Sequence, residues 1–361
     1  MVHLTEHDVS YSDGKKTIHY VAAGPLNGPL IIFVHGWPGI AKTWRPQLET
    51  FAGLGFRVVA PDMPGYGKST ANKVYSAYAQ SEISQGLLAL LADTGRKKAV
   101  WVAHDWGSGC LWTLAAVHPE VCIGVINLAV PYRLLELGLE ELMKVVNREK
   151  YPEAEFPYGQ WSYQVFYEQD FEKATSWFDA DPAGVLRVLF IKGSAANLDK
   201  PARTATVVKD GGWMGGAPKP PSQDQIPTGA STLDNLPAED VQELEEAMAR
   251  TGFFGGDAYY MNHKANREWV LKNSVNDGIL EMPVLFIEAK YDTVCDTYGS
   301  RNTEPMKELC KDLSMASIDA GHWVQLEKAE ETNGVIAKWL LESLPEYWPT
   351  HWHSPIAKQK H

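Results

Sequence analysis

The stretch that decides the fold is Val100-Trp101-Val102-Ala103-His104-Asp105-Trp106-Gly107-Ser108-Gly109, where an apolar run stops at two polar residues and small residues follow. A nucleophile elbow has this order of strand, tight turn and helix. It needs small residues two positions before and two after the nucleophile, because its turn is strained. Ala103 and Gly107 occupy those positions, so we predict that Asp105 is the nucleophile. The structural alternative is that Asp105 only caps the helix that follows.

Similar apolar runs recur along the chain and end at polar residues. They lie at Leu30–Val34, Phe56–Ala60, Lys98–Ala103, Val121–Val130, Val284–Ile287 and, more weakly, Leu313–Ile318, and a further strand is predicted at Thr17–Ala23. Helical patterns lie between them at Trp44–Leu54, Tyr75–Leu91 and Ser108–Val117. This alternation predicts an α/β fold with a mostly parallel, doubly wound sheet. Ligands of such sheets bind beyond the carboxyl ends of the strands, where we expect His35, Asp62, Asp105, Asp292 and His322.

The alternating pattern breaks between Val130 and Met282. Leu134–Asn147 and Asp240–Ala249 have helical patterns, and no buried parallel strand is evident there. We therefore predict a core made of residues 1–130 and 265–361 and an inserted, mainly helical cap made of residues 131–264. Within the cap, residues 193–237 form a long Gly/Pro-rich stretch, predicted as a functional or mobile loop.

The composition excludes several classes of protein. The 361 residues are 45% hydrophobic and 22% charged, which is typical of a globular protein and not of a disordered one. A net charge of -12 without a basic cluster argues against nucleic-acid partners and anionic membranes. The longest apolar runs, about ten residues, are too short for membrane insertion, which needs ~18–20.

The four cysteines, Cys110, Cys122, Cys295 and Cys310, have no C-x-x-C spacing, so we predict unpaired thiols. Because the first ten residues also lack the pattern of a signal peptide, we expect a cytoplasmic protein. His351 and His353 have no further ligand nearby and do not predict a metal site.

An acid and a histidine follow the elbow in the order that this fold class requires. Asp292 comes after the strand at Val284–Ile287, and His322 comes after the strand at Leu313–Ile318. We predict that Asp105, Asp292 and His322 form a catalytic triad. No G-x-S-x-G motif occurs, which argues against a serine esterase or lipase.

The loop His35-Gly36-Trp37-Pro38 follows the strand at Leu30–Val34. An oxyanion hole needs one backbone N–H from such a loop and one from the residue after the nucleophile. Trp37 and Trp106 would supply them, and a simple β-turn is the alternative for this loop.

These motifs resemble the α/β-hydrolase-fold epoxide hydrolases of the soluble, cap-domain type. The resemblance rests on His35-Gly36-Trp37-Pro38, on His104-Asp105-Trp106-Gly107 and on the late Asp292 and His322, and Pro61-Asp62-Met63-Pro64-Gly65-Tyr66-Gly67-Lys68-Ser69 is similar to a further loop of that family. It spans most of the chain, from about Thr17 to Leu341. Haloalkane dehalogenases share the fold, the aspartate nucleophile and the Asp-Trp pair, so the elbow alone does not choose between the two families.

The leaving group separates the two chemistries. An ionised aspartate can attack a tetrahedral carbon without a base and form an ester, and His322, oriented by Asp292, can activate water against that ester. A halide leaves as a stable anion, whereas an epoxide oxygen leaves as an alkoxide and needs an acid such as a phenol.

The resemblance implies that two tyrosines of the cap supply this acid. Trp161-Ser162-Tyr163-Gln164-Val165-Phe166-Tyr167 resembles the first of the family's segments and points to Tyr163. Gly255-Gly256-Asp257-Ala258-Tyr259-Tyr260-Met261-Asn262 resembles the second and favours Tyr260, with Tyr259 as the adjacent alternative.

The sequence therefore predicts an epoxide hydrolase that converts an apolar epoxide and water to a vicinal diol through an aspartyl ester. We expect no metal and no organic cofactor, and substrate contacts from Trp106, Phe166 and Trp161. A haloalkane or haloacid dehalogenase is the alternative, and a non-catalytic ligand receptor on a hydrolase scaffold is a remote one. The oligomeric state stays open, with a homodimer among the arrangements allowed.

Overall fold

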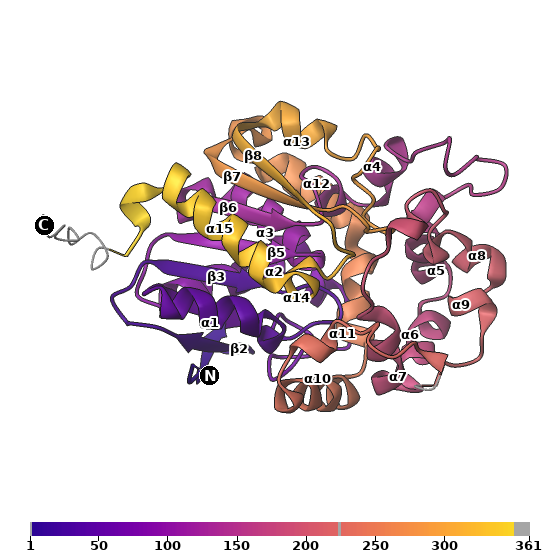
Figure 1. The fold of residues 1–361 in the computed structure, drawn as a ribbon, viewed down its shortest axis with the longest axis horizontal. Helices are drawn as coiled ribbons and strands as arrows, with labels where there is room; N and C mark the ends of the chain where they lie inside the picture. Colours follow the sequence, from indigo (N-terminus) through magenta and orange to yellow (C-terminus); the bar gives the residue numbers. More distant parts are fainter. Residues whose placement is uncertain (1, 223–224, 350–361) are drawn as a thin grey trace, which may run out of the picture.

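The fold is built on one eight-stranded sheet in the order β1-β2-β4-β3-β5-β6-β7-β8 (Figure 1). The computed structural model describes residues 2–222 and 225–349, so His351 and His353 lie outside the described residues. The strands are β1 (Thr5–Tyr11), β2 (Lys16–Ala23), β3 (Leu30–Val34), β4 (Arg57–Pro61), β5 (Ala99–His104), β6 (Cys122–Leu128), β7 (Leu280–Ala289) and β8 (Cys310–Ile318). β2 pairs antiparallel with β1 and β4, and the other strands pair in parallel. The predicted class is confirmed.

Each predicted strand is present, and β1 is the one strand of the sheet that we did not predict. β1 lies at the edge of the sheet and pairs with β2 alone. Its sequence is mostly polar, and only Tyr11 is buried. An edge strand of this kind carries no apolar run, so its pattern does not separate it from a loop.

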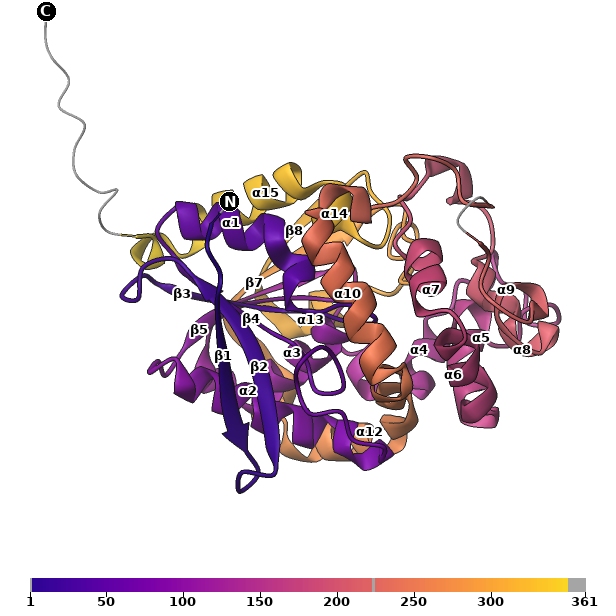
Figure 2. The same cartoon turned by 90° about the horizontal axis from the view of Figure 1, so that it is seen from below.

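Helices cover both faces of the sheet (Figures 1 and 2). On one face lie η1 (Ala41–Trp44), α1 (Arg45–Gly53), α14 (Val324–Glu327) and α15 (Ala329–Ser343), and on the other α2 (Gln80–Asp93), α3 (Trp106–Val117), α12 (His263–Asn273) and α13 (Glu304–Leu309). Short 3-10 turns lie at η2 (Tyr75–Tyr78), η3 (Pro119–Val121), η11 (Val275–Gly278) and η12 (Pro345–Tyr347). In β3, Ile31 and Phe33 pack on the face covered by α1 and α15, whereas Ile32 and Val34 pack on the face covered by α2 and α3. A central strand buried on both faces explains its continuous apolar run.

The chain between β6 and β7 forms helices at the end of the sheet where the cap was predicted. They are η4 (Leu135–Leu137), α4 (Leu139–Lys144), η5 (Gly159–Trp161), α5 (Ser162–Gln169), α6 (Phe171–Asp179), α7 (Pro182–Leu189), η6 (Ala195–Asn197), η7 (Arg203–Thr206), α8 (Val207–Asp210), α9 (Trp213–Gly216), η9 (Leu233–Asn235), α10 (Ala238–Thr251), α11 (Phe254–Asp257) and η10 (Ala258–Asn262). The domain boundary proposed at 264 falls inside α12, which packs against α2 and α3 of the core. We propose that the cap ends just before His263.

The stretch 193–237 contains five short helical turns, η6, η7, α8, α9 and η9, in its described residues. Ala205, Val207 and Leu233 from these turns are buried in the same hydrophobic cluster as the cap helices. This packing holds residues 193–237 against the other helices of the cap. The many glycines and prolines of this stretch prevent any long helix.

None of the described helices is both long enough and apolar enough to cross a membrane. All four cysteines are buried and free, which confirms the prediction of unpaired thiols.

Candidate active site

Asp105 lies at the tip of the turn between β5 and α3, with φ 54° and ψ -127°. A positive φ is costly for a residue with a side chain and marks a strained turn. A Cβ on Gly107 would lie 2.3 Å from the carbonyl oxygen of Val34, so only glycine fits two positions later. Asp105 occupies the N-cap position of α3, but its side chain makes no capping hydrogen bond. Its carboxylate is therefore not used as a helix cap.

The loop after β3 brings a backbone donor to this carboxylate. The N–H of Trp37 donates to Oδ1 of Asp105 at 2.6 Å. His35 braces the loop, because its Nε2 accepts from the N–H of Met63 at 2.9 Å and its Nδ1 donates to the carbonyl of Gly36 at 2.9 Å. Burial lowers the pKa of His35 to about 4, which keeps the imidazole neutral as these two bonds require.

A second backbone donor lies beside Asp105. Trp106 is the first residue of α3, so its N–H has no carbonyl partner within the helix. Trp37 and Trp106 thus offer N–H groups from two different elements, in the arrangement that an oxyanion hole needs.

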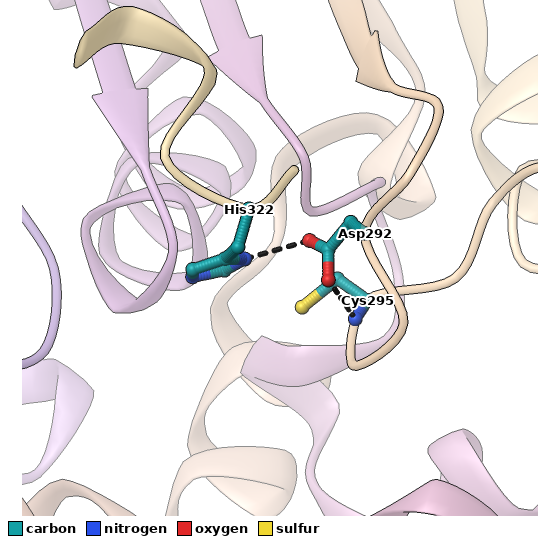
Figure 3. A group of neighbouring side chains, drawn as sticks. All are labelled: Asp292, Cys295 and His322. Carbon is teal, nitrogen blue, oxygen red and sulfur yellow. Dashed lines mark hydrogen bonds and ion pairs between the residues drawn. The ribbon is translucent and has the colours of Figure 1, made fainter. Parts of the chain in front are cut away.

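His322 stands between two carboxylates. Its Nδ1 lies 2.6 Å from Oδ2 of Asp292 (Figure 3). Its Nε2 lies 3.4 Å from Oδ2 of Asp105. The other oxygen of Asp292 accepts from the backbone N–H groups of Val294 and Cys295 at 2.9 and 3.0 Å. Because an ionised carboxylate only accepts, Nδ1 carries a proton toward Asp292, and Nε2 faces Asp105.

The two carboxylates also set the charge of His322. Burial by itself lowers the pKa of His322, but attraction to Asp292 and hydrogen bonds to Asp105 and Asp292 outweigh it, and the pKa lies well above its usual value. His104 positions this residue from behind, since its Nε2 donates to the backbone carbonyl of His322 at 2.7 Å. Burial lowers the pKa of His104 well below its usual value, so His104 stays neutral.

Asp292, Cys295 and His322 offer three candidate metal-ligand atoms within 4.8 Å of one another (Figure 3). Two of these atoms are already paired, because Asp292 and His322 share a short hydrogen bond. Burial raises the pKa of the Cys295 thiol to about 12, and a protonated thiol is a poor ligand. The geometry suits proton transfer better than metal binding.

Tyr163 on α5 and Tyr260 on η10 line the same cavity as Asp105 and His322. Their rings meet edge to face at 5.5 Å between centroids. Burial raises the pKa of both phenols above the usual value, so both carry a proton at neutral pH. The amide of Gln164 donates to the Tyr163 oxygen at 3.1 Å, which leaves the Tyr163 proton free to donate into the cavity.

Tyr259 points away from the cavity. Its hydroxyl donates to the carbonyl of Pro64 at 2.9 Å, and Tyr259 is absent from the cavity lining. Of the two adjacent tyrosines, Tyr260 is the one that shares the cavity with Asp105.

The cavity measures about 560 Å³ and has a wall of aromatic residues. They include Trp37, Tyr167, Trp177, Phe178 and Trp213. Of the predicted substrate contacts, Trp106 and Phe166 do not line it, and Trp161 lines a small adjoining pocket with Asp105 and Tyr163. Trp106 instead packs against Tyr260, and Phe166 packs behind Trp213.

Asp257, at the end of α11, has no role in the sequence prediction. It does not line the cavity, but it contacts residues that do. Its buried carboxylate accepts hydrogen bonds from Trp37, Tyr167 and Thr175. The available signal was an acidic residue within an otherwise small and aromatic run, Gly255–Tyr260. Burial raises the pKa of Asp257 to about 7, although each of the three hydrogen bonds lowers it.

Comparisons with known proteins agree with this geometry. A family model described as alpha/beta hydrolase fold matches residues 29–329. The chain is 28% identical over 337 residues to epoxide hydrolase A of Mycobacterium tuberculosis H37Rv, covering 90% of this chain and 94% of that protein. It is 30% identical over 352 residues to epoxide hydrolase B of the same organism, covering 90% and 95%. The crystal structure of epoxide hydrolase A from Mycobacterium thermoresistibile superposes with a TM-score of 0.73 at 27% identity, covering 94% of this chain and 98% of that one.

Proposed function

The chain belongs to the epoxide hydrolases of the alpha/beta hydrolase fold family, and on that basis we propose that Asp105, Asp292, His322, Tyr163 and Tyr260 open an epoxide in two covalent steps. One observation carries the proposal. The carboxylate of Asp105 shares its cavity with two buried, protonated phenols. An epoxide oxygen requires such acids, whereas the halide of a dehalogenase substrate does not, so the dehalogenase alternative is not favoured.

In the first step, Oδ2 of Asp105 attacks a carbon of the epoxide, and the breaking C–O bond leaves its electrons on oxygen. Tyr163 and Tyr260 hold that oxygen, and one of them transfers its proton to it. The products are an ester on Asp105 and a hydroxyl group. The phenolate regains a proton from the solvent, to which His322 loses one after esterification. The N–H of Trp37 keeps Oδ1 in place, so Oδ2 is the oxygen free to attack.

In the second step, His322 takes a proton from water, and the resulting hydroxide attacks the carbonyl carbon of the ester. The negative charge then develops on Oδ1, where the N–H groups of Trp37 and Trp106 stabilise it. The C–O bond of the ester then breaks, and the leaving oxygen takes the proton that His322 holds, which releases the diol. The carboxylic acid left at Asp105 returns its proton to His322. Esterification makes Asp105 neutral and so removes one of the two carboxylates that raise the pKa of His322, which brings the imidazole to its basic form.

The aromatic wall of the cavity favours an epoxide with a bulky apolar or aromatic body. We place the enzyme in the cytoplasm, a location that its four free thiols support.

The test is one turnover of an aryl epoxide in heavy-oxygen water, followed by mass spectrometry of the peptide that contains Asp105. We expect a vicinal diol and one heavy oxygen in Asp105, because the ester oxygen leaves with the product. Asp105→Asn should form neither diol nor label in the same period. A diol without label would refute the ester, and halide release from a matched alkyl halide without any diol would move the protein to the dehalogenases.

A further inference from the structure

Asp257 is a fully buried carboxylate held by neutral donors. Its side chain has no exposed surface, and it belongs to none of the ion pairs formed by the described residues. Three segments donate to it: the loop after β3 through Trp37, α5 through Tyr167, and α6 through Thr175. Burying a charged carboxylate without a cation costs free energy, so a buried acid at this position indicates a specific role.

One carboxylate oxygen links the two halves of the site. Oδ1 of Asp257 accepts from Nε1 of Trp37 at 2.9 Å and from the hydroxyl of Tyr167 at 2.9 Å. The backbone N–H of Trp37 is the donor on Asp105, and the ring of Tyr167 stacks on Tyr260 at 4.8 Å with an angle of 11°. The third donor, the Thr175 hydroxyl, reaches the other oxygen at 2.8 Å.

The backbone around Asp257 is shaped for this approach. A Cβ on Gly256 would lie 2.6 Å from the hydroxyl oxygen of Tyr66 and 2.8 Å from Cδ1 of Trp37. Glycine at position 256 therefore lets α11 lie directly against the loop His35–Pro38, here called the oxyanion loop. In this position Asp257 can reach the indole of Trp37.

We propose that Asp257 is a positioning residue that sets the oxyanion loop and the phenols of the cap relative to each other. It does not line the cavity, and it acts through Trp37 on Asp105 and through Tyr167 on Tyr260. A carboxyl group suits this task because one of its oxygens accepts from Trp37 and Tyr167 at once while the other meets Thr175. Its loss would leave buried donors unpaired on both sides of the site.

The test separates the two chemical steps by rapid-quench single turnover, measuring formation and hydrolysis of the Asp105 ester by mass spectrometry. Trp37→Phe keeps the backbone N–H but loses the indole donor, so it should slow chiefly ester hydrolysis. Tyr167→Phe keeps the ring but loses the hydroxyl, so it should slow chiefly ester formation. Asp257→Leu should slow both steps by about tenfold or more, since small displacements of reacting groups are costly.

Two further variants distinguish positioning from mere stability. Asp257→Asn keeps an oxygen for Trp37 and Tyr167 and can donate to Thr175, so both rates should recover to within about threefold of wild type. Thr175→Val removes the third hydrogen bond, which touches neither Trp37 nor Tyr167, and should leave both rates within about twofold even where it lowers the melting temperature.

Unchanged rates in both Trp37→Phe and Tyr167→Phe would overturn the proposal, whether or not Asp257→Leu folds. So would equal losses in Asp257→Leu and Thr175→Val. The inference rests on the proposed roles of Asp105 and Tyr260. Measurements on the wild type distinguish a failure of those roles from a failure of the positioning role. Wild-type protein that forms no ester on Asp105 would refute those roles, whereas normal ester formation with unaffected variants would refute the positioning role alone.

Discussion

At the scale of single residues, Tyr259 and Tyr260 are chain neighbours with opposite environments. The Tyr259 hydroxyl donates a hydrogen bond to the carbonyl of Pro64, whereas Tyr260 faces the cavity and packs edge to face with Tyr163. Both phenols are buried, and burial raises the pKa of each well above its usual value. What separates the two is therefore the direction of the hydroxyl and not its acidity.

Tyr260→Phe should lower the rate of ester formation by about 10²- to 10⁴-fold, the usual contribution of a positioned general acid. Tyr259→Phe is the matched control, because it removes a hydroxyl one residue away that does not line the cavity, and its rate should stay within about threefold of wild type. The measurement is a rapid-quench assay of the Asp105 ester. A larger loss in Tyr259→Phe than in Tyr260→Phe would reverse the assignment.

In the proposed mechanism, the charge of Asp292 sets the pH dependence of the second step. Its carboxylate raises the pKa of His322, and the basic form of His322 exists only above that pKa. Asp292→Asn should therefore move the rise of ester hydrolysis to lower pH and also lower its plateau, because a neutral amide stabilises the imidazolium less. Single-turnover hydrolysis across the neutral pH range measures both effects.

Asp319→Asn is the control for this change. Asp319 is an exposed residue paired with Lys290 at 3.1 Å, and it lies near His322 in the chain but outside the cavity lining. Its pH profile should match that of the wild type. A rise at the same pH in Asp292→Asn and wild type would show that His322 is not the group that titrates.

At the scale of elements, the short turns η7, α8 and α9 form part of the cavity wall that the core alone does not supply. Trp213 at the start of α9 packs on Phe178 at 4.8 Å and on Tyr167 at 5.5 Å, and its indole donates to the carbonyl of Ala174 at 3.1 Å. These contacts join the 193–237 stretch to α5 and α6. We therefore propose that the stretch contributes to substrate selection.

Trp213→Leu should raise the KM for a bulky aromatic epoxide by about tenfold, while the KM for a small aliphatic epoxide changes by less than about twofold, since only the large substrate reaches this wall. Steady-state kinetics on both substrates provide the measurement. Trp269→Leu, on α12 outside the cavity lining, should change neither value. Equal changes for both substrates in Trp213→Leu would mean that the tryptophan supports the fold and not the pocket.

At the scale of the whole molecule, Asp257 makes stability depend on pH. Burial raises its pKa from 3.8 to about 7, so between these values the folded protein binds a proton that the unfolded chain has lost. Stability should therefore fall as pH rises through this window, at up to about 1.4 kcal/mol for each pH unit. Glu136, whose pKa burial raises to about 7, contributes with the same sign.

Asp257→Asn should remove the share of this slope that Asp257 causes, because an amide does not titrate. Urea unfolding of wild type and variant at about pH 5 and about pH 8 provides the test. The variant should lose less stability between the two pH values than the wild type, with Glu136 contributing equally to both. Parallel losses in the two proteins would show that Asp257 does not titrate in this range.

The sequence by itself determined the fold class, seven of the eight strands and the chain order of Asp105, Asp292 and His322. These features are local: a strand buried on both faces needs a continuous apolar run, and a strained turn needs small residues at fixed positions. β1 escaped prediction because an edge strand carries no such run.

Only the tertiary structure shows that Tyr260 and not Tyr259 lines the cavity with Asp105, that Trp177, Phe178 and Trp213 lie in the cavity wall, and that Asp257 contacts Trp37. These outcomes depend on which way side chains of the cap turn once its short helices pack, and short helices without long periodic patterns do not reveal their buried face. Asp257 and Trp37 are far apart in the chain, and only packing of α11 against the oxyanion loop makes them neighbours.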